Sequence, residues 1–442
     1  MINKLVHRNL LLFYIAYTIL VLYFMCVYEM NMPPYEILCI QVFIAVLSLF
    51  TMLFMDRYKV SMLYYMIFIF QLICSVILRC FFIYYYNNPL GENAIDSTYY
   101  HLLSVQTYRM SFDDFISYLK FNIEDLSDFG FPIVQYSLYK ISGDPTLGIN
   151  LMVLYNVILH LISCVFVYKL SMIITKDKVK SKIVLVFWGF NFCSIWLNVS
   201  GLKEQTFLFF IVLTMYALYS FFNSKRKIYL CLFILGITII WFFRYYLSLF
   251  FILIFISKRF VSQKIYKNIY PLVFIFLFVV VAISSSLLNI WMPEFESLEN
   301  VVDYRLNSPS EFVKYSNFIL TFISPFPNIV NTEAVQNMYF VPFSLLKVSI
   351  SGFYMYMMYK VFTNRNDYLY PIISFICLDI LLCMVSGFVG NYRYLYCMMP
   401  FYFIISVIGS YEIQTYKYKN IYCFIYLLIC FLLFFQNNLN KV

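Results

Sequence analysis

Four basic side chains lie within or beside long apolar runs of this sequence. They are Arg79, Lys203, Arg244 and Arg393. A cation at the middle of a bilayer costs about 2.5 to 3.5 kcal/mol on insertion scales, so such a residue usually has a partner or a function. Anchoring at helix ends or pairing with acids is one explanation. A site for a lipid-linked phosphate is the other, because the guanidinium fork fits phosphate oxygens. Four cations at one membrane depth favour this second explanation.

Asp96 and His101 are the candidates for acid-base chemistry. Asp96 stands at the start of a predicted helix, next to Tyr99 and Tyr100. A carboxylate in that position commonly caps the helix. It is also where a general base for an acceptor hydroxyl is expected if a sugar is transferred. Three roles are open to His101, a base, a metal ligand or a surface hydrogen-bond donor, and we favour the last.

Glu124, Asp125 and Asp128 form an acidic turn whose oxygens suit a divalent cation. A solvated turn explains the same residues, and we favour it. The twelve cysteines lie almost entirely in apolar runs and include no CxxC pair, which indicates small hydrophobic residues rather than disulfides or a zinc site. We therefore predict no metal-binding residues and no certain cofactor, and dependence on a divalent cation stays open.

Composition predicts the elements that carry these residues. With 63% hydrophobic residues, 12% charged residues and a mean hydropathy of +0.79, the chain has too little polar surface for a water-soluble protein. Its apolar runs have the length of membrane-spanning helices, so we expect an all-α integral membrane protein, one polytopic domain over 1–442 with about 13 transmembrane helices. The runs lie near 10–28, 37–55, 62–85, 149–170, 183–197, 206–222, 228–242, 245–257, 269–288, 339–361, 370–388, 395–411 and 421–435. The segment 228–257 is either one long kinked helix or a tight hairpin at Phe243 and Arg244.

Lysine and arginine residues set the expected orientation. If the N-terminus is cytoplasmic, most of the 31 basic residues fall on the cytoplasmic side, as in the cluster from Lys169 to Lys182. The net charge of +9 is then explained by basic residues that gather on the cytoplasmic side of the membrane. Nucleic acid is therefore not expected as a partner. The polar segment 87–145 becomes the first outer, periplasmic loop. The segment 289–338, which contains Arg305, becomes the second.

Two short amphipathic helices are predicted in the first outer loop. The first spans 96–110, with Asp96 as its N-cap and an apolar face formed by Leu102, Val105 and the Tyr108 ring. The second spans 111–120, with Ser111 as its N-cap and apolar residues at helical spacing, namely Phe112, Phe115, Ile116 and Leu119. We expect both helices to lie on the membrane with their apolar faces down. The following segment, FGFPIVQYSLYKISGD, is expected to pack back against the bundle.

A series of short motifs resembles the polytopic glycosyltransferases of the GT-C superfamily, which includes protein mannosyltransferases and lipid A aminoarabinose transferases. The motifs are DSTYYHLLS at 96–104, DFGFPIVQYSLYKISGDPTLGIN at 128–150, SGLKEQTFLFF at 200–210, FFRYYLSLF at 242–250, ISPFPN at 323–328 and GNYRYLYCMMPF at 390–401. The resemblance implies a polyprenyl-phosphate-linked sugar donor and a base at Asp96. The chain departs from the family by two extra spans ahead of the loop and by a single Asp in place of an acidic pair, which bears on metal dependence.

The chain also resembles the Wzy-type polysaccharide polymerases, which use lipid-diphosphate sugars at the outer face. Those proteins usually carry their largest, arginine-bearing loop late in the chain. Here the early loop is the longer and more acidic one, which favours the GT-C resemblance, while Arg305 and Arg393 keep the polymerase as an alternative.

We therefore expect a glycosyltransferase that moves a sugar from a polyprenyl phosphate or diphosphate carrier to a glycan, lipid or protein acceptor, in surface polysaccharide or glycolipid synthesis at the outer face of a bacterial cytoplasmic membrane. Asp96 and His101 are the candidates for catalysis. The candidates for binding the carrier phosphate are Arg79, Lys203, Arg244, Arg305 and Arg393. The alternatives are an O-antigen or capsule repeat-unit polymerase and a lipid-linked oligosaccharide flippase. A flippase is less favoured, because charge at the predicted midplane is sparse.

Overall fold

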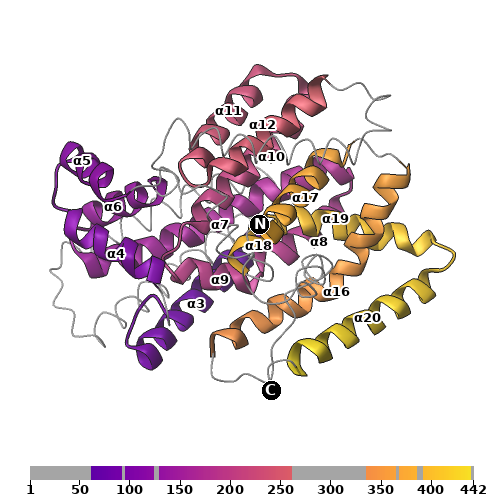
Figure 1. Ribbon diagram of the computed structural model, residues 1–442, viewed down its shortest axis with the longest axis horizontal. Helices are drawn as coiled ribbons and strands as arrows, with labels where there is room; N and C mark the ends of the chain where they lie inside the picture. Colours follow the sequence, from indigo (N-terminus) through magenta and orange to yellow (C-terminus); the bar gives the residue numbers. More distant parts are fainter. Residues whose placement is uncertain are drawn as a thin grey trace, which may run out of the picture.

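The computed structural model describes residues 61–91, 95–123, 129–260, 335–364, 368–385 and 392–439 (Figure 1). Within these ranges every regular element is a helix and no strand occurs. The apolar runs predicted near 10–28, 37–55 and 269–288 lie outside the described residues, as does nearly all of the predicted second outer loop. The predicted all-α class is therefore confirmed for the described part of the chain.

The helices of the described bundle coincide with predicted apolar runs. They are α3 (Ser61–Tyr86), α7 (Pro145–Thr175), α8 (Lys178–Gly189), α9 (Phe192–Val199), α10 (Glu204–Ser224), α11 (Lys227–Trp241), α12 (Tyr245–Phe260), α16 (Val335–Asn364), α17 (Tyr370–Val385), α19 (Met399–Glu412) and α20 (Lys419–Leu439). A five-residue helix, α18 (Tyr392–Tyr396), lies between α17 and α19 near the centre of Figure 1.

Length and composition identify the helices that are able to cross a membrane. Among the described residues, three helices qualify, namely the Met62–Tyr86 part of α3, α7 and α10. The pair α8 and α9, bent by 43° at a short break, forms a further candidate. Shorter apolar segments lie in α11, α12, α17 and α20. These helices are those expected of a membrane protein, while the predicted number of spans remains a prediction.

The segment 228–257 is a hairpin and not a kinked helix. The ring centroids of Phe233 in α11 and Phe255 in α12 lie 5.2 Å apart, and Ser248 Oγ donates to the Ile237 carbonyl at 2.8 Å. In one continuous helix, residues with the spacing of Phe233 and Phe255 stand roughly 33 Å apart. The chain reverses over Phe242, Phe243 and Arg244, and this turn places Arg244 directly before α12.

Three short helices, α4 (Ile95–Thr107), α5 (Phe112–Asn122) and α6 (Gly130–Ser142), form the segment predicted as the first outer loop. Ser111 is the N-cap of α5, as predicted, and its hydroxyl accepts a hydrogen bond from the Asp114 amide at 3.2 Å. The predicted N-cap role of Asp96 is wrong. Because α4 begins at Ile95, Asp96 lies inside the first turn, where the positive end of the helix dipole favours a carboxylate.

The apolar faces of α4 and α5 are covered by protein only in part, since Phe112 is 54% exposed, and the prediction that these helices rest on the membrane stays a prediction. The ring of Phe115 stacks on that of Tyr136 from α6, with centroids 4.0 Å apart. Leu103 of α4 and Leu119 of α5 are buried in the same cluster. On α4, Leu102 of the predicted apolar face is 53% exposed, while Leu103 is buried against α5 and α6. The position of α6 decides which face of α4 is covered.

A contact at Gly130 joins the segment of α4, α5 and α6 to the rest of the bundle. The Gly130 amide donates a hydrogen bond to the Phe242 carbonyl at 2.9 Å. A Cβ at residue 130 would stand 2.8 Å from the Phe243 ring and 2.9 Å from that carbonyl. Only glycine therefore allows α6 to approach the α11–α12 turn this closely, and the contact fixes the outer segment beside Arg244.

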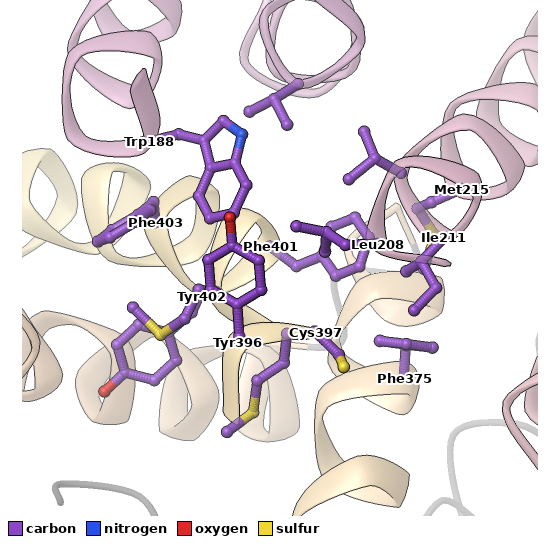
Figure 2. Packing of buried hydrophobic residues seen from close by; sticks show 14 of the residues in the cluster. Trp188, Leu208, Ile211, Met215, Phe375, Tyr396, Cys397, Phe401, Tyr402 and Phe403 are labelled. Atoms are coloured by element: carbon purple, nitrogen blue, oxygen red, sulfur yellow. The ribbon is translucent and has the colours of Figure 1, made fainter. Parts of the chain in front are cut away.

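Buried aromatic side chains fill the interior beneath α18. Figure 2 shows the rings of Trp188 from α8 and Tyr396 from α18 next to each other, with Leu208 from α10 and Phe403 from α19 nearby. The centroids of the Trp188 and Tyr396 rings lie 5.2 Å apart, and both residues are fully buried. The Tyr396 hydroxyl also donates to Gln205 Oε1 at 2.8 Å. These contacts fix α18 against the start of α10.

Candidate functional site

Four charged side chains from distant parts of the sequence form one continuous series, which we call the ion-pair chain: Asp96, Arg393, Glu204 and Arg244. Arg393 Nη1 lies 2.7 Å from Asp96 Oδ2. Arg393 Nε lies 2.9 Å from Glu204 Oε1, and the same oxygen lies 3.3 Å from Arg244 Nη2. One carboxylate oxygen of Glu204 therefore links the two guanidinium groups.

Each member of the ion-pair chain comes from a different element. Asp96 lies in the first turn of α4, Glu204 begins α10, Arg244 precedes α12 and Arg393 lies in α18. Both acids sit at helix N-termini, where the dipole stabilises negative charge. The packing of α18 on α10 and the Gly130 contact bring these four positions together.

The two ends of the ion-pair chain differ in exposure. The side chain of Glu204 is 0% exposed and that of Arg244 is 7% exposed. The side chain of Arg393 is 21% exposed and that of Asp96 is 52% exposed. The series therefore has a buried end at Arg244 and Glu204 and an end open to solvent at Asp96. A ligand from outside the bundle reaches the Asp96 end first.

Aromatic rings surround the buried guanidinium group. The Cζ atom of Arg244 lies 4.4 Å from the centre of the Tyr394 ring and 4.9 Å from that of Phe207. Arg244 Nη1 also donates to the Tyr246 hydroxyl at 2.9 Å. These contacts and Glu204 together compensate the burial of the Arg244 charge.

Arg393 remains a cation in this environment. Its burial by itself lowers the pKa of the guanidinium, but Glu204 and then Asp96 outweigh that effect and raise the pKa above its ordinary value. A permanent cation with one exposed partner is suited to binding an anion.

His101 and Arg79 belong to a separate group of contacts. His101 Nδ1 lies 2.7 Å from the Tyr139 hydroxyl, and Arg79 donates to Asn150 Oδ1. Burial, with a smaller contribution from Arg79, lowers the pKa of His101 below its ordinary value, so its ring is neutral at pH 7. Asp96 and His101 are five residues apart, which on a helix turns their side chains roughly 140° from each other, and the two residues do not form a pair. His101 thus forms an internal hydrogen bond in place of the predicted surface one.

Lys203 is buried directly before α10, and its carbonyl accepts the amides of Thr206 and Phe207 at 3.1 and 3.2 Å. Arg305 lies outside the described residues, and so do Glu124, Asp125 and Asp128.

In the ranges that the structure describes, no three His, Cys, Asp or Glu side chains are grouped as a metal site. Asp379 is buried in α17, where it interacts electrostatically with Arg244.

Glu204 is the member of the ion-pair chain that sequence reasoning did not select. In the sequence its neighbour Lys203 provides an obvious local partner, which hides the long-range pairs with Arg244 and Arg393. A usable signal exists, because an acid at the first position of an apolar run needs cations nearby once it is buried. The predicted arginines at the same membrane depth are the cations that meet this need.

Comparison of the chain with protein-family models, curated proteins and solved structures finds no match. The geometry described above is therefore the basis for assigning a function.

Proposed function

We propose that this protein is an integral-membrane glycosyltransferase that moves a sugar from a polyprenyl phosphate or diphosphate carrier to an acceptor at the outer face of a bacterial cytoplasmic membrane. The observation that carries the proposal is the ion-pair chain. It combines an exposed carboxylate with two arginines, one of them partly exposed, beside the start of an apolar helix. A carboxylate and nearby guanidinium groups are what a base-assisted transfer from an anionic carrier needs.

In the proposed reaction, Asp96 takes the proton of the acceptor hydroxyl. The acceptor oxygen then forms a bond to the sugar C1 carbon, and the bond from C1 to the carrier phosphate oxygen breaks. The electron pair of that bond stays on the carrier phosphate. Arg393, at the partly exposed position of the ion-pair chain, binds this phosphate and stabilises the charge that it gains.

Arg244 and Glu204 support Arg393 from the buried side. Arg244 contributes a second positive charge close to the carrier, while Glu204 links the two guanidinium groups. Arg79, Lys203 and Arg305 stay candidates for contacts with the carrier. His101 is assigned to holding α4 on α6 through Tyr139, since its ring is bonded there. The proposed partners are the lipid-linked sugar, a glycan, lipid or protein acceptor, and membrane lipid.

The position of Arg393 also favours a second candidate, a Wzy-type repeat-unit polymerase. Such an enzyme binds a lipid diphosphate at the same membrane face. An arginine late in the chain that meets a second arginine across one carboxylate suits a diphosphate equally well. The two candidates differ in the product and share the chemistry at Arg393.

Analysis of lipid-linked and surface glycans from a deletion strain tests the proposal. Loss of one sugar residue from the glycan indicates the transferase. Loss of chain length with an intact single unit indicates the polymerase. An unchanged set of glycosidic bonds, with movement of lipid-linked glycan across reconstituted vesicles, would contradict both candidates and indicate a flippase.

A further inference from the structure

Among the residues that the structure describes, Arg393 pairs with two acids that differ in exposure. Its Nε atom is held at 2.9 Å by Glu204, whose side chain is 0% exposed. Its Nη1 atom is held at 2.7 Å by Asp96, whose side chain is 52% exposed. One partner is thus fixed in the interior at the start of α10, and the other lies at the surface on α4.

The four side chains of the ion-pair chain carry no net positive charge that would attract a further anion. Two guanidinium groups face two carboxylates, so the four side chains are formally neutral. A phosphate group placed on Arg393 adds negative charge close to both carboxylates, and like charges at such distances repel strongly away from bulk water. Phosphate therefore binds best if one carboxylate leaves the guanidinium group.

Only one of the two carboxylates leaves at low cost. Moving Glu204 away would leave the buried Arg244 and the partly exposed Arg393 without their shared counterion, which is strongly unfavourable. Asp96 is half exposed and returns to water by a change of side-chain rotamer. The exposed end of the ion-pair chain is thus its exchangeable end.

We propose that Asp96 and the phosphate of the lipid carrier exchange on Arg393. In the free protein Asp96 occupies the Nη1 edge of the guanidinium group. When a polyprenyl phosphate binds, its oxygen takes that edge, Glu204 keeps Arg393 in place through Nε, and Asp96 is released toward the acceptor hydroxyl. The inference rests on the proposed function and adds to it that the base is released only once the donor is bound.

The test measures binding of farnesyl phosphate, a short polyprenyl phosphate, to the purified full-length protein in dodecyl maltoside micelles. Asp96→Asn removes the competing charge, so this variant is expected to bind farnesyl phosphate about three- to tenfold more tightly than the wild type. Asp96→Ala is expected to change the affinity in the same direction. Asp113→Asn is the matched control, because Asp113 is an exposed acid of the neighbouring helix α5. Its affinity is expected to match the wild type, and equal tightening there would show a nonspecific charge effect and overturn the exchange.

Arg393→Gln separates failure of the exchange from failure of the proposed function. If Arg393→Gln weakens farnesyl phosphate binding while both Asp96 variants bind like the wild type, the phosphate site stands and the exchange is wrong. If Arg393→Gln binds like the wild type, Arg393 is not the phosphate site and the proposed function loses its support. Farnesol, which lacks the phosphate, is expected to bind all variants equally, and its binding verifies that they are folded.

Glu204→Asp tests the positioning role of Glu204. The variant keeps the negative charge, but its side chain is shorter by one methylene, so the carboxylate lies farther from Arg393. We expect farnesyl phosphate affinity to fall about three- to tenfold, with farnesol binding unchanged. Wild-type affinity for farnesyl phosphate in Glu204→Asp would show that Glu204 does not position Arg393.

Discussion

At the scale of single residues, Glu204 has the largest energetic role in the ion-pair chain. It is fully buried and accepts hydrogen bonds from Arg244 and Arg393 through one oxygen. Removing one partner from a buried ionic group leaves uncompensated charge in the interior, at a cost of about 3 to 5 kcal/mol. The stability of this region therefore depends on Glu204 more than on Asp96.

We expect Glu204→Ala to lower the free energy of unfolding by about 3 to 5 kcal/mol. Glu204→Gln keeps an acceptor oxygen, so we expect a smaller decrease in the free energy of unfolding. The midpoint of thermal unfolding in detergent measures both effects. Glu412→Gln is the control, because Glu412 pairs with Lys360 in a partly exposed position where loss of the pair costs about 1 kcal/mol or less. Equal losses for Glu204→Ala and Glu412→Gln would show that Glu204 is not the buried counterion of the arginines.

His101 predicts an acid-sensitive contribution to stability. Its pKa is lowered in the folded state, first by burial and then by Arg79, from an ordinary value of 6.5. The unfolded chain therefore binds the His101 proton more readily, and the contribution, present above pH 6.5, is lost as the pH falls below that value. The midpoint of thermal unfolding should drop less in His101→Gln than in the wild type between about pH 7.5 and about pH 5. An identical drop in both proteins would contradict this assignment.

Residues were predicted well where the signal is local. The Ser111 cap was found because a capping residue and its partner are close in sequence. Asp96, Arg244 and Arg393 stood out as charges at membrane edges, yet their mutual contacts depend on four separate elements. No pattern within one segment indicates which acid meets which arginine.

At the scale of elements, the contact between the α11–α12 turn and α6 positions the site. The sequence left a hairpin and a kinked helix equally open, because Phe242 and Phe243 continue the apolar run without a turn residue. The ring contact between Phe233 and Phe255 resolves the question in favour of the hairpin. Likewise, the covered faces of α4 and α5 depend on α6, whose position no periodicity within α4 or α5 specifies.

Gly130→Ala tests the contact between α6 and the α11–α12 turn. The added Cβ would stand 2.8 Å from the Phe243 ring and 2.9 Å from the Phe242 carbonyl, so α6 must move away from the turn. We expect a loss of about 1 to 3 kcal/mol in stability and faster proteolysis of the outer segment. Ser137→Ala, at an exposed position of the same helix, is the control and should behave like the wild type. A wild-type proteolysis pattern in Gly130→Ala would contradict the role of this contact.

At the scale of the whole molecule, the proposed reaction requires that the ion-pair chain face the outer side of the membrane. The distribution of Lys and Arg predicts that α4, α5 and α6 lie outside and that the α7–α8 turn, with Lys176, Lys178 and their neighbours, lies in the cytoplasm. Among the described residues, three helices fit membrane spans by length and composition, or four spans if the bent pair of α8 and α9 counts as one. Their orientation is open to direct measurement.

Cysteine labelling with a membrane-impermeant maleimide measures this orientation. We expect Asp113→Cys on α5 to be labelled in intact bacterial cells. Lys178→Cys, an exposed position at the start of α8, should be labelled only after the membrane is permeabilised. Labelling of both positions from the same side, or the reverse pattern, would place the ion-pair chain away from the proposed substrates.

The role of Asp96 in sugar transfer is tested by the surface glycan made by a deletion strain that carries Asp96→Asn, with Asp113→Asn as the matched control. Both variants must reach wild-type levels in the membrane. We expect the Asp96→Asn strain to produce the same truncated glycan as the deletion strain, and the Asp113→Asn strain to produce the wild-type glycan. A wild-type glycan from Asp96→Asn would contradict the assignment of the ion-pair chain as the site of sugar transfer.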